Sequence, residues 1–104
     1  MQVPTIKVTF EVKSFLTRDF GHEGLGRLVT EETVAKGSSG MELLHTLAGR
    51  YPLFRKKAFT VKHKVTFDYC AVILNGTYLC RLTELDTELK DGDTLKLIPH
   101  IYGG

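Results

Sequence analysis

The sequence predicts an α+β domain in which a mixed sheet of about five strands packs against one main helix. Three segments carry this prediction: the alternating stretch TIKVTFEVK, the amphipathic stretch ELLHTLAGRYP and the hairpin stretch CAVILNGTYLC. Two strands are expected before the helix and three after it, so strands and helices do not alternate as they would in an α/β fold. With 104 residues, of which 42% are hydrophobic and 25% charged, the chain has the size of one domain with a single core.

The first strand is predicted in TIKVTFEVKSFL, where apolar and polar residues alternate from Ile6 to Lys13. Ile6, Val8, Phe10 and Val12 share one side with this two-residue period, so one face of the strand is expected to be buried.

A turn is expected in the next stretch, TRDFGHEGLG, because it combines three glycines with polar residues. The glycines have the spacing G-x-x-G-x-G, whereas dinucleotide-binding loops use G-x-G-x-x-G in front of a helix, so no nucleotide site is expected here. The stretch RLVTEETV then predicts a second strand that forms a hairpin with the first.

The main helix is predicted from apolar residues that recur with a 3.6-residue period. These residues are Leu43, Leu44, Leu47, Ala48 and Tyr51, whereas Glu42, Thr46 and Arg50 face away. Ser39 and Glu42 have the spacing of a capping box, in which each side chain bonds a backbone N–H of the first turn. Pro52 predicts that the helix stops near Tyr51.

Residues 54–69 show no steady hydrophobic period and are expected to form a loop with one possible strand. This segment concentrates basic residues, namely Arg55, Lys56, Lys57, Lys62 and Lys64. The formal charge of the chain is only +2, too small to indicate nucleic-acid binding. We interpret the cluster as a solvated basic face, with docking to an acidic protein partner as the alternative.

The last part of the chain predicts a hairpin, a turn and a final strand. Asn75 and Gly76 tolerate positive φ and follow an aliphatic run, which is typical of a two-residue hairpin turn. The stretch KDGD predicts a turn before the strand TLKLIP, and it lacks the further ligands of a calcium loop. Pro99 cannot donate a backbone hydrogen bond, so the domain is expected to cover residues 1–99 and residues 100–104 to form a flexible C-terminal tail.

The two cysteines, Cys70 and Cys80, flank this hairpin. If Leu74 pairs with Thr77, Cys80 lies opposite Ala71 and the two cysteines fall on opposite faces of the sheet, so both are expected to be free thiols. They lack the spacing of a zinc site, and no metal is expected.

Several classes of function are disfavoured by what the sequence lacks. No apolar run reaches the length of a membrane helix, and the first residues do not follow the layout of a signal peptide, so a cytoplasmic protein is expected. No nucleophile and base stand at a recognisable spacing, and His22, His45, His63 and His100 are scattered. We therefore expect a non-catalytic protein.

The order of these motifs resembles the ubiquitin-like β-grasp sulfur carriers of the ThiS/MoaD type. The resemblance rests on the first strand, ELLHTLAGRYP, VILNG, LKDGDTLKLIP and the final Gly103 and Gly104. It lies closest to the small subunit of molybdopterin synthase. It implies a β-grasp fold, in which the first and last strands are adjacent and parallel at the centre of the sheet.

The resemblance also implies a mechanism in molybdenum cofactor biosynthesis. An activating enzyme uses ATP to adenylate the carboxylate of Gly104, and a sulfur donor displaces AMP to leave a thiocarboxylate. The thiocarboxylate then delivers sulfur to a precursor held by the large synthase subunit. In this scheme the chain binds no cofactor, no membrane and no nucleic acid, and Gly103, Tyr102, Ile101 and Ile98 contact its partners.

A narrow tail suits this chemistry independently of the family. Gly103 and Gly104 lack Cβ atoms, so their backbone can enter a channel that excludes other residues. Two alternatives share the same sequence features: a ubiquitin-like modifier conjugated to lysines through Gly104, and an interaction module whose tail is inert. The final sulfur acceptor, the oligomeric state and the role of residues 54–69 do not follow from the sequence.

Overall fold

The computed structural model describes residues 4–21, 26–59, 70–79 and 82–99, and these form five strands and four helical segments. The elements are β1 (Thr5–Lys13), the 3₁₀ helix η1 (Ser14–Phe20), β2 (Arg27–Ala35), α1 (Gly40–Arg50), α2 (Pro52–Ala58), β3 (Ala71–Leu74), β4 (Thr77–Leu79), the 3₁₀ helix η2 (Leu82–Asp86) and β5 (Thr94–Ile98).

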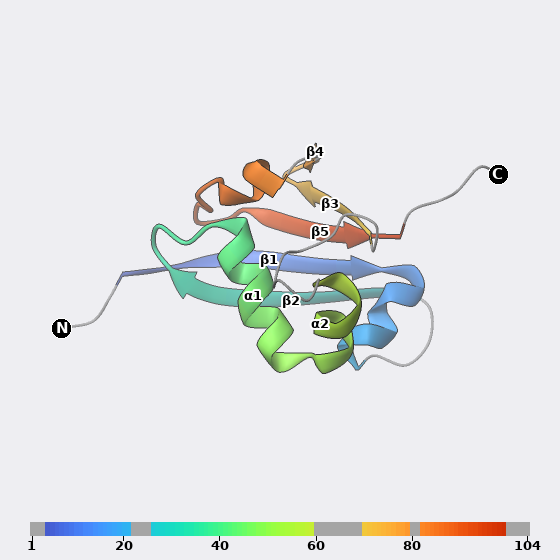
Figure 1. Cartoon of the computed structure of the whole chain (residues 1–104). Coiled ribbons are helices and arrows are strands. Elements are labelled where there is room, and N and C mark those ends of the chain that lie inside the picture. Colours follow the sequence, from blue (N-terminus) through green and yellow to red (C-terminus); the bar gives the residue numbers. More distant parts are fainter. Residues whose placement is uncertain (1–3, 22–25, 60–69, 80–81, 100–104) are drawn as a thin grey trace.

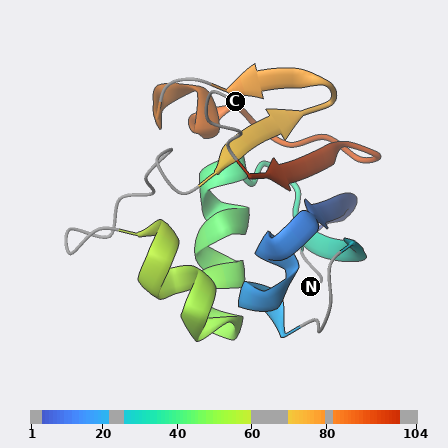
Figure 2. The same ribbon diagram turned by 90° about the vertical axis from the view of Figure 1, so that its right-hand side faces the viewer.

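The five strands form one mixed sheet in the order β2-β1-β5-β3-β4. β1 and β5 lie side by side and run parallel at the centre, and the other neighbours pair antiparallel. α1 and α2 lie across one face of this sheet (Figure 1; Figure 2). This arrangement confirms the α+β class and the central parallel pair that the β-grasp resemblance implies.

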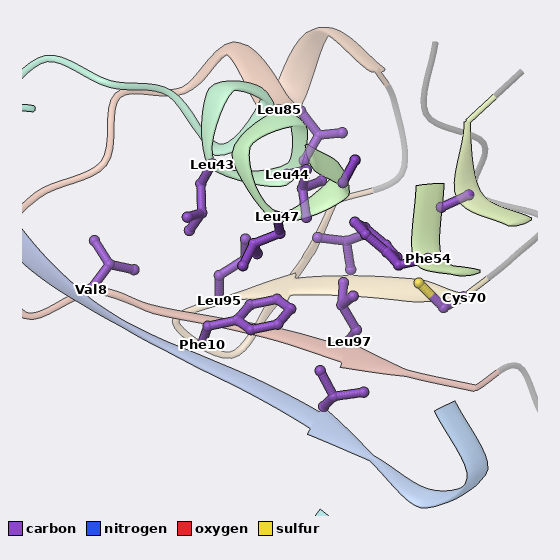
Figure 3. Packing of buried hydrophobic residues seen from close by; sticks show 14 of the residues in the cluster. Val8, Phe10, Leu43, Leu44, Leu47, Phe54, Cys70, Leu85, Leu95 and Leu97 are labelled. Carbon is purple, nitrogen blue, oxygen red and sulfur yellow. The ribbon is translucent and has the colours of Figure 1, made fainter. Parts of the chain in front are cut away.

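The core lies between the sheet and α1. Its residues come from the apolar positions that the two-residue period of β1 and the 3.6-residue period of α1 predict. Val8 and Phe10 project from β1, and Leu95 and Leu97 from β5, toward the helices (Figure 3). Leu43, Leu44 and Leu47 of α1 meet them, and all of these residues are at most 1% exposed. The alternation of β1 and the 3.6-residue period of α1 thus describe two surfaces of the same core.

The predicted capping box is present at the start of α1. The Ser39 hydroxyl accepts a hydrogen bond from the Glu42 N–H (3.1 Å), and the Glu42 carboxylate accepts one from the Ser39 N–H (3.2 Å). The helix ends at Arg50, with Tyr51 in extended conformation, as Pro52 predicts.

The expectation of a loop after Pro52 is wrong for the residues that the structure describes, since Pro52–Ala58 form α2. Pro52 cannot continue α1, but its fixed φ suits the first turn of a new helix. Phe54 and Ala58, four residues apart, are both buried against the core. The possible strand between residues 60 and 69 lies outside the described residues.

The first strand ends at Lys13 and not at Leu16, and the turn expected from Thr17 onward is wrong for residues 17–20, since Ser14–Phe20 form η1. Leu16 and Phe20 are buried, and the Phe20 ring packs against Phe54 with centroids 4.8 Å apart. Lys57 of α2 donates a 2.9 Å hydrogen bond to the buried carboxylate of Asp19. Packing between η1 and α2 therefore stabilises a helical segment that the local sequence does not predict.

Candidate functional site at the end of the last strand

Of the five predicted site residues, the structure describes one, Ile98. Ile101, Tyr102, Gly103 and Gly104 lie outside the described residues, as does the predicted tail 100–104. Ile98 is the last residue of β5, so the strand ends just before Pro99, as predicted. The candidate site is therefore described through Ile98 and the surface around the end of β5.

The end of β5 is held from both sides by neighbouring strands. Leu97 is in register with Val12 of the parallel strand β1, and Ile98 with Ala71 of the antiparallel strand β3. Because β5 is a central strand, the chain leaves the sheet from its middle and not from an edge (Figure 1). Ile98, the last residue of β5, is thereby fixed at the centre of the sheet.

Ile98 belongs to the face of the sheet opposite α1. Thr94, Lys96 and Ile98 alternate with the buried Leu95 and Leu97, and each of the three is half-buried. Side chains from neighbouring strands extend this face, among them Ile73 in register with Lys96, and Tyr78, which is 57% exposed and in register with Ile73. An apolar surface with one lysine thus lies beside Ile98 at the end of β5.

A buried carboxylate lies at the centre of the same face. Glu11 of β1 is only 3% exposed, although it occupies a polar position of the alternating strand. Its Oε1 accepts a hydrogen bond from Arg27 Nε of β2, and its Oε2 lies 3.2 Å from Lys96 Nζ of β5. The three residues form an ion cluster across β2, β1 and β5.

Burial of Glu11 acts to raise the pKa of its carboxyl group, and this is the largest influence on it. Arg27 and Lys96 together outweigh it, so the pKa lies below the ordinary value of 4.5. Glu11 is therefore charged at neutral pH, and one carboxylate is shared by two cations. Sequence reasoning missed this cluster because only the strand order brings Arg27 and Lys96 to the sides of Glu11.

The start of β5 is tied to the hairpin turn by a second set of hydrogen bonds. Asn75 and Gly76 both adopt positive φ (50° and 84°), as predicted. The Asn75 amide donates to the Asp93 carboxylate (2.9 Å) and accepts from the Thr94 N–H (2.8 Å). Asp93 also accepts a hydrogen bond from the Lys90 N–H, so its carboxylate links the hairpin turn to the turn that precedes β5.

Cys70, next to β3, is a free thiol with no catalytic character. Burial raises its pKa to about 12, so the nucleophilic thiolate is suppressed at neutral pH. Leu74 pairs with Thr77 and Val72 with Leu79, which confirms the predicted hairpin register. Cys80 lies outside the described residues.

The sequence assigns no catalytic role to the four histidines. Of these, His45 is exposed and packs its ring against Phe59, with centroids 4.8 Å apart. His22, His63 and His100 lie outside the described residues. The part of the chain that the structure describes contains no group of three or more potential metal ligands. None of its helices is long and apolar enough to cross a membrane.

The basic cluster is described only in part. Arg55, Lys56 and Lys57 lie on α2, and Lys57 pairs with Asp19, whereas Lys62 and Lys64 lie outside the described residues. One member of the cluster thus connects α2 to η1.

Comparison with protein families gives one match, to the ThiS family, over residues 22–104. A comparison with curated protein sequences gives no match. The matched region includes every described element from β2 to β5 and reaches Gly103 and Gly104.

Several solved structures share the fold. The HVO 2177 protein of Haloferax volcanii is 19% identical with a TM-score of 0.73, covering 96% of this chain and 88% of that one. SAMP1 of H. volcanii is 20% identical (TM-score 0.70; 94% and 99% covered). A putative molybdopterin converting factor subunit 1 of Pyrococcus furiosus is also 20% identical (TM-score 0.67; 92% and 99% covered). At these identities the likeness concerns the fold.

Proposed function

The chain belongs to the ThiS family, and on this premise we propose that it is a sulfur carrier whose terminal Gly104 is converted to a thiocarboxylate. The observation that carries the proposal is the family match over residues 22–104, which runs through β5 and includes both final glycines. The fold supports it, since β5 directs the chain out of the centre of the sheet at Ile98.

The proposed reaction proceeds in two steps, both in the active site of another protein. A carboxylate oxygen of Gly104 attacks the α-phosphorus of ATP, which releases pyrophosphate and leaves an acyl-adenylate. A sulfur donor at the oxidation level of hydrosulfide then attacks the carbonyl carbon, AMP departs, and the sulfur remains as a thiocarboxylate. ATP is thus a substrate of the activating enzyme, and the carrier itself binds no cofactor.

In this scheme the carrier provides a C-terminus narrow enough to enter the pocket, and the partner enzyme provides the catalytic groups. The acyl-adenylate must form in a pocket that excludes water, because water would hydrolyse it. Residues without Cβ atoms suit the narrow entrance to such a pocket, which is the role we assign to Gly103 and Gly104. Ile98, Ile101 and Tyr102 are proposed to contact the partner beside this entrance.

The open face around Ile98 supports partner binding. It combines apolar side chains, Ile73 and Tyr78, with the Glu11–Arg27–Lys96 cluster, which carries one more cation than anions. Two partners would use it in turn, the activating enzyme and a large synthase subunit. We propose delivery of sulfur in molybdenum cofactor biosynthesis, in a role like that of the small subunit of molybdopterin synthase.

The second candidate is a protein modifier that becomes linked to lysines through Gly104. Its support is the fold that the chain shares with proteins named small archaeal modifier protein 1. Both candidates require adenylation of Gly104, so they differ only in the group that displaces AMP.

Intact-mass spectrometry after incubation with the activating enzyme, ATP and a sulfur donor tests the proposal. We expect one oxygen to be replaced by sulfur, about 16 Da, with fragmentation placing the change on Gly104. Deletion of Gly104 and the substitution Gly103→Val should abolish the change while the melting temperature stays the same, because both positions lie outside the predicted sheet.

Two outcomes would overturn the sulfur-carrier proposal. Conjugates that resist reducing agent and map to Gly104, without a thiocarboxylate, would favour the modifier. The wild-type chain could keep its mass after incubation with its cognate activating enzyme, while the chain without Gly104 still complements a strain that lacks this protein. These two results together would favour an interaction module with an inert tail.

A further inference from the structure

β2 is a long, regular edge strand, and its charged residues are Arg27, Glu31 and Glu32. It comes first in the strand order, so in the described part of the chain its outer side has no neighbouring strand (Figure 1; Figure 2). It is nine residues long and pairs with β1 without a bulge from Arg27 to Ala35. It contains neither proline nor lysine. Long, regular edges of this kind are templates for another strand.

The pairing of β2 with β1 identifies which backbone groups face outward. At the two ends of the ladder, Lys36 N donates to Pro4 O (2.9 Å) and Ser14 N donates to Gly26 O (2.6 Å). Even-numbered residues of β2 therefore direct their N–H and C=O groups toward β1, and odd-numbered residues direct theirs outward. Of the latter, the described structure engages the Ala35 carbonyl, which accepts a hydrogen bond from Ser38 N.

The odd-numbered residues also carry a self-complementary set of side chains. Arg27, Val29 and Glu31 alternate along the same face, with Val29 at their centre. Val29 is 46% exposed, so its side chain is available for contact with another copy. Arg27 uses its Nε for Glu11, and its side chain is 66% exposed, so its terminal nitrogens remain accessible.

We propose that β2 pairs antiparallel with β2 of a second copy of this chain, with Val29 on the two-fold axis. Val29 then faces Val29 of the second copy, and each Arg27 faces Glu31 of the other copy, once on either side. All of these positions are odd-numbered, so the outward N–H and C=O groups of both edges meet. The two sheets become one continuous sheet of ten strands.

Charge selects this register over its neighbours. Moving the axis to Glu31 would place the two Glu31 carboxylates directly opposite each other, which destabilises a strand pair. Pairing Val29 with Glu31 would place Arg27 opposite Thr33 and leave every charge without a counterpart. Glu31 is accessible for the proposed pair, since its contact with Lys7 is long (3.6 Å) and exposed.

The interface leaves the end of β5 free, although it shares Arg27 with the Glu11–Arg27–Lys96 cluster. β1 lies between β2 and β5, so the two-fold axis is on the far side of β1 from Ile98. A dimer could therefore present two tails at once. A single strand pair is small compared with interfaces of stable complexes, so we expect dissociation in the micromolar range or above.

Sedimentation velocity over a concentration series up to about 1 mM tests the proposal. We expect the wild type to shift reversibly from monomer to dimer. Glu31→Arg should remain monomeric, because two arginines would then face each other at both ends of the pair. Thr33→Arg is the matched control: it adds the same side chain to the same face outside the Arg27–Glu31 pairing, and it should still dimerise. Circular dichroism verifies that both variants fold.

Cysteine cross-linking reads the register directly. Residues paired on opposite strands lie within the Cα separation that a disulfide accepts, so Val29→Cys should cross-link to itself during air oxidation catalysed by copper phenanthroline. Thr33→Cys and the wild type, which retains Cys70 and Cys80, serve as controls and should not cross-link through this strand. Peptide mapping would assign the bond.

A wild type that stays monomeric throughout the series would overturn the proposal. So would a dimer that persists in Glu31→Arg, or one in which Glu31→Cys cross-links in preference to Val29→Cys. None of these outcomes depends on the chemistry of Gly104. The dimer and the proposed function are therefore tested independently, and either can fail without the other.

Discussion

Glu11 shows how one residue can depart from the pattern of its strand without disturbing it. Its position in the alternation is polar, and its side chain does project from the open face. It is nevertheless buried, because Arg27 and Lys96 on the two neighbouring strands cover it. Removing one member of such a cluster leaves the others without their counterion.

We expect Glu11→Gln to lower the free energy of unfolding by about 1.5–3 kcal/mol at pH 7, the range for hydrogen bonds to charged groups. The pKa of Glu11 is lower in the folded state than its ordinary 4.5, so its contribution is fully present above that value. The contribution is lost as the pH falls through the folded-state pKa. Urea denaturation of both proteins from pH 3 to pH 7 should therefore show a difference that narrows in acid.

A difference in stability that stays constant over this range would contradict the assignment. Glu31→Gln is the matched control, since Glu31 lies on the same face with a 66% exposed side chain. Exposed ion pairs contribute little, so this substitution should change the free energy of unfolding by less than about 1 kcal/mol.

At the scale of elements, local sequence determines where α1 begins and ends. Ser39 and Glu42 satisfy two backbone N–H groups of the first turn, and Pro52 prevents the helix from continuing. These signals act within a few residues, which is why they could be identified without the fold.

We expect Ser39→Ala to destabilise the domain by about 0.5–2 kcal/mol, because the N–H of Glu42 loses its acceptor. Thermal melting followed by circular dichroism measures the effect. Ser38→Ala, one position earlier, is the control and should have a smaller effect; equal losses in both variants would mean that the capping box is not their cause.

The Asn75–Gly76 turn joins β3 to β4 and is also hydrogen-bonded to the start of β5. Asn75 adopts positive φ, and its side chain bonds both Asp93 and Thr94 at the start of β5. Asn75→Ala should cost about 2–4 kcal/mol, since it combines backbone strain with the loss of two hydrogen bonds.

Asn75→Gly separates the two contributions, because glycine adopts positive φ without strain. We expect it to be more stable than Asn75→Ala and less stable than the wild type in chemical denaturation. A glycine variant as stable as the wild type would show that the bonds to Asp93 and Thr94 contribute nothing measurable.

At the scale of the whole molecule, the pairing of β1 with β5 joins the two ends of the described chain. This parallel pair lies at the centre of the sheet, and Leu97 and Val12 are in register within it. The core therefore forms only when residues far apart in the sequence meet.

We expect Leu97→Ala to lower the free energy of unfolding by about 2–5 kcal/mol, because Leu97 is 1% exposed and truncation leaves a cavity. Unfolding should remain a single transition, with circular dichroism and tyrosine fluorescence giving coincident curves. Leu53→Ala, at a 52% exposed position of α2, should change stability by less than about 0.5 kcal/mol. Separate transitions for the two probes would contradict a single core.

The elements that could be predicted are those whose signals lie within a few residues of each other. The alternation of β1, the apolar face of α1 and the Asn75–Gly76 turn each need only a short stretch of sequence. The end of β5 before Pro99 has the same origin. The structure describes Ile98 at the end of β5, and its contact with a partner stays a prediction; the other predicted site residues lie outside the described chain.

The misassigned segments share a different origin. η1 and α2 stabilise each other through the Phe20–Phe54 ring contact and the Lys57–Asp19 pair, between residues separated by more than thirty positions. The hydrophobic period of a short segment does not predict a contact between residues so far apart in the sequence. The Glu11–Arg27–Lys96 cluster was missed for the same reason.

The sequence by itself determined the class of fold, the position of the main helix, the hairpin register and the end of the last strand, because backbone preferences and side-chain periods act locally. The tertiary structure alone decided the complete strand order and the side-chain contacts across it. That order buries Glu11 between two cations and leaves β2 with a free edge, since both depend on which strand lies beside which.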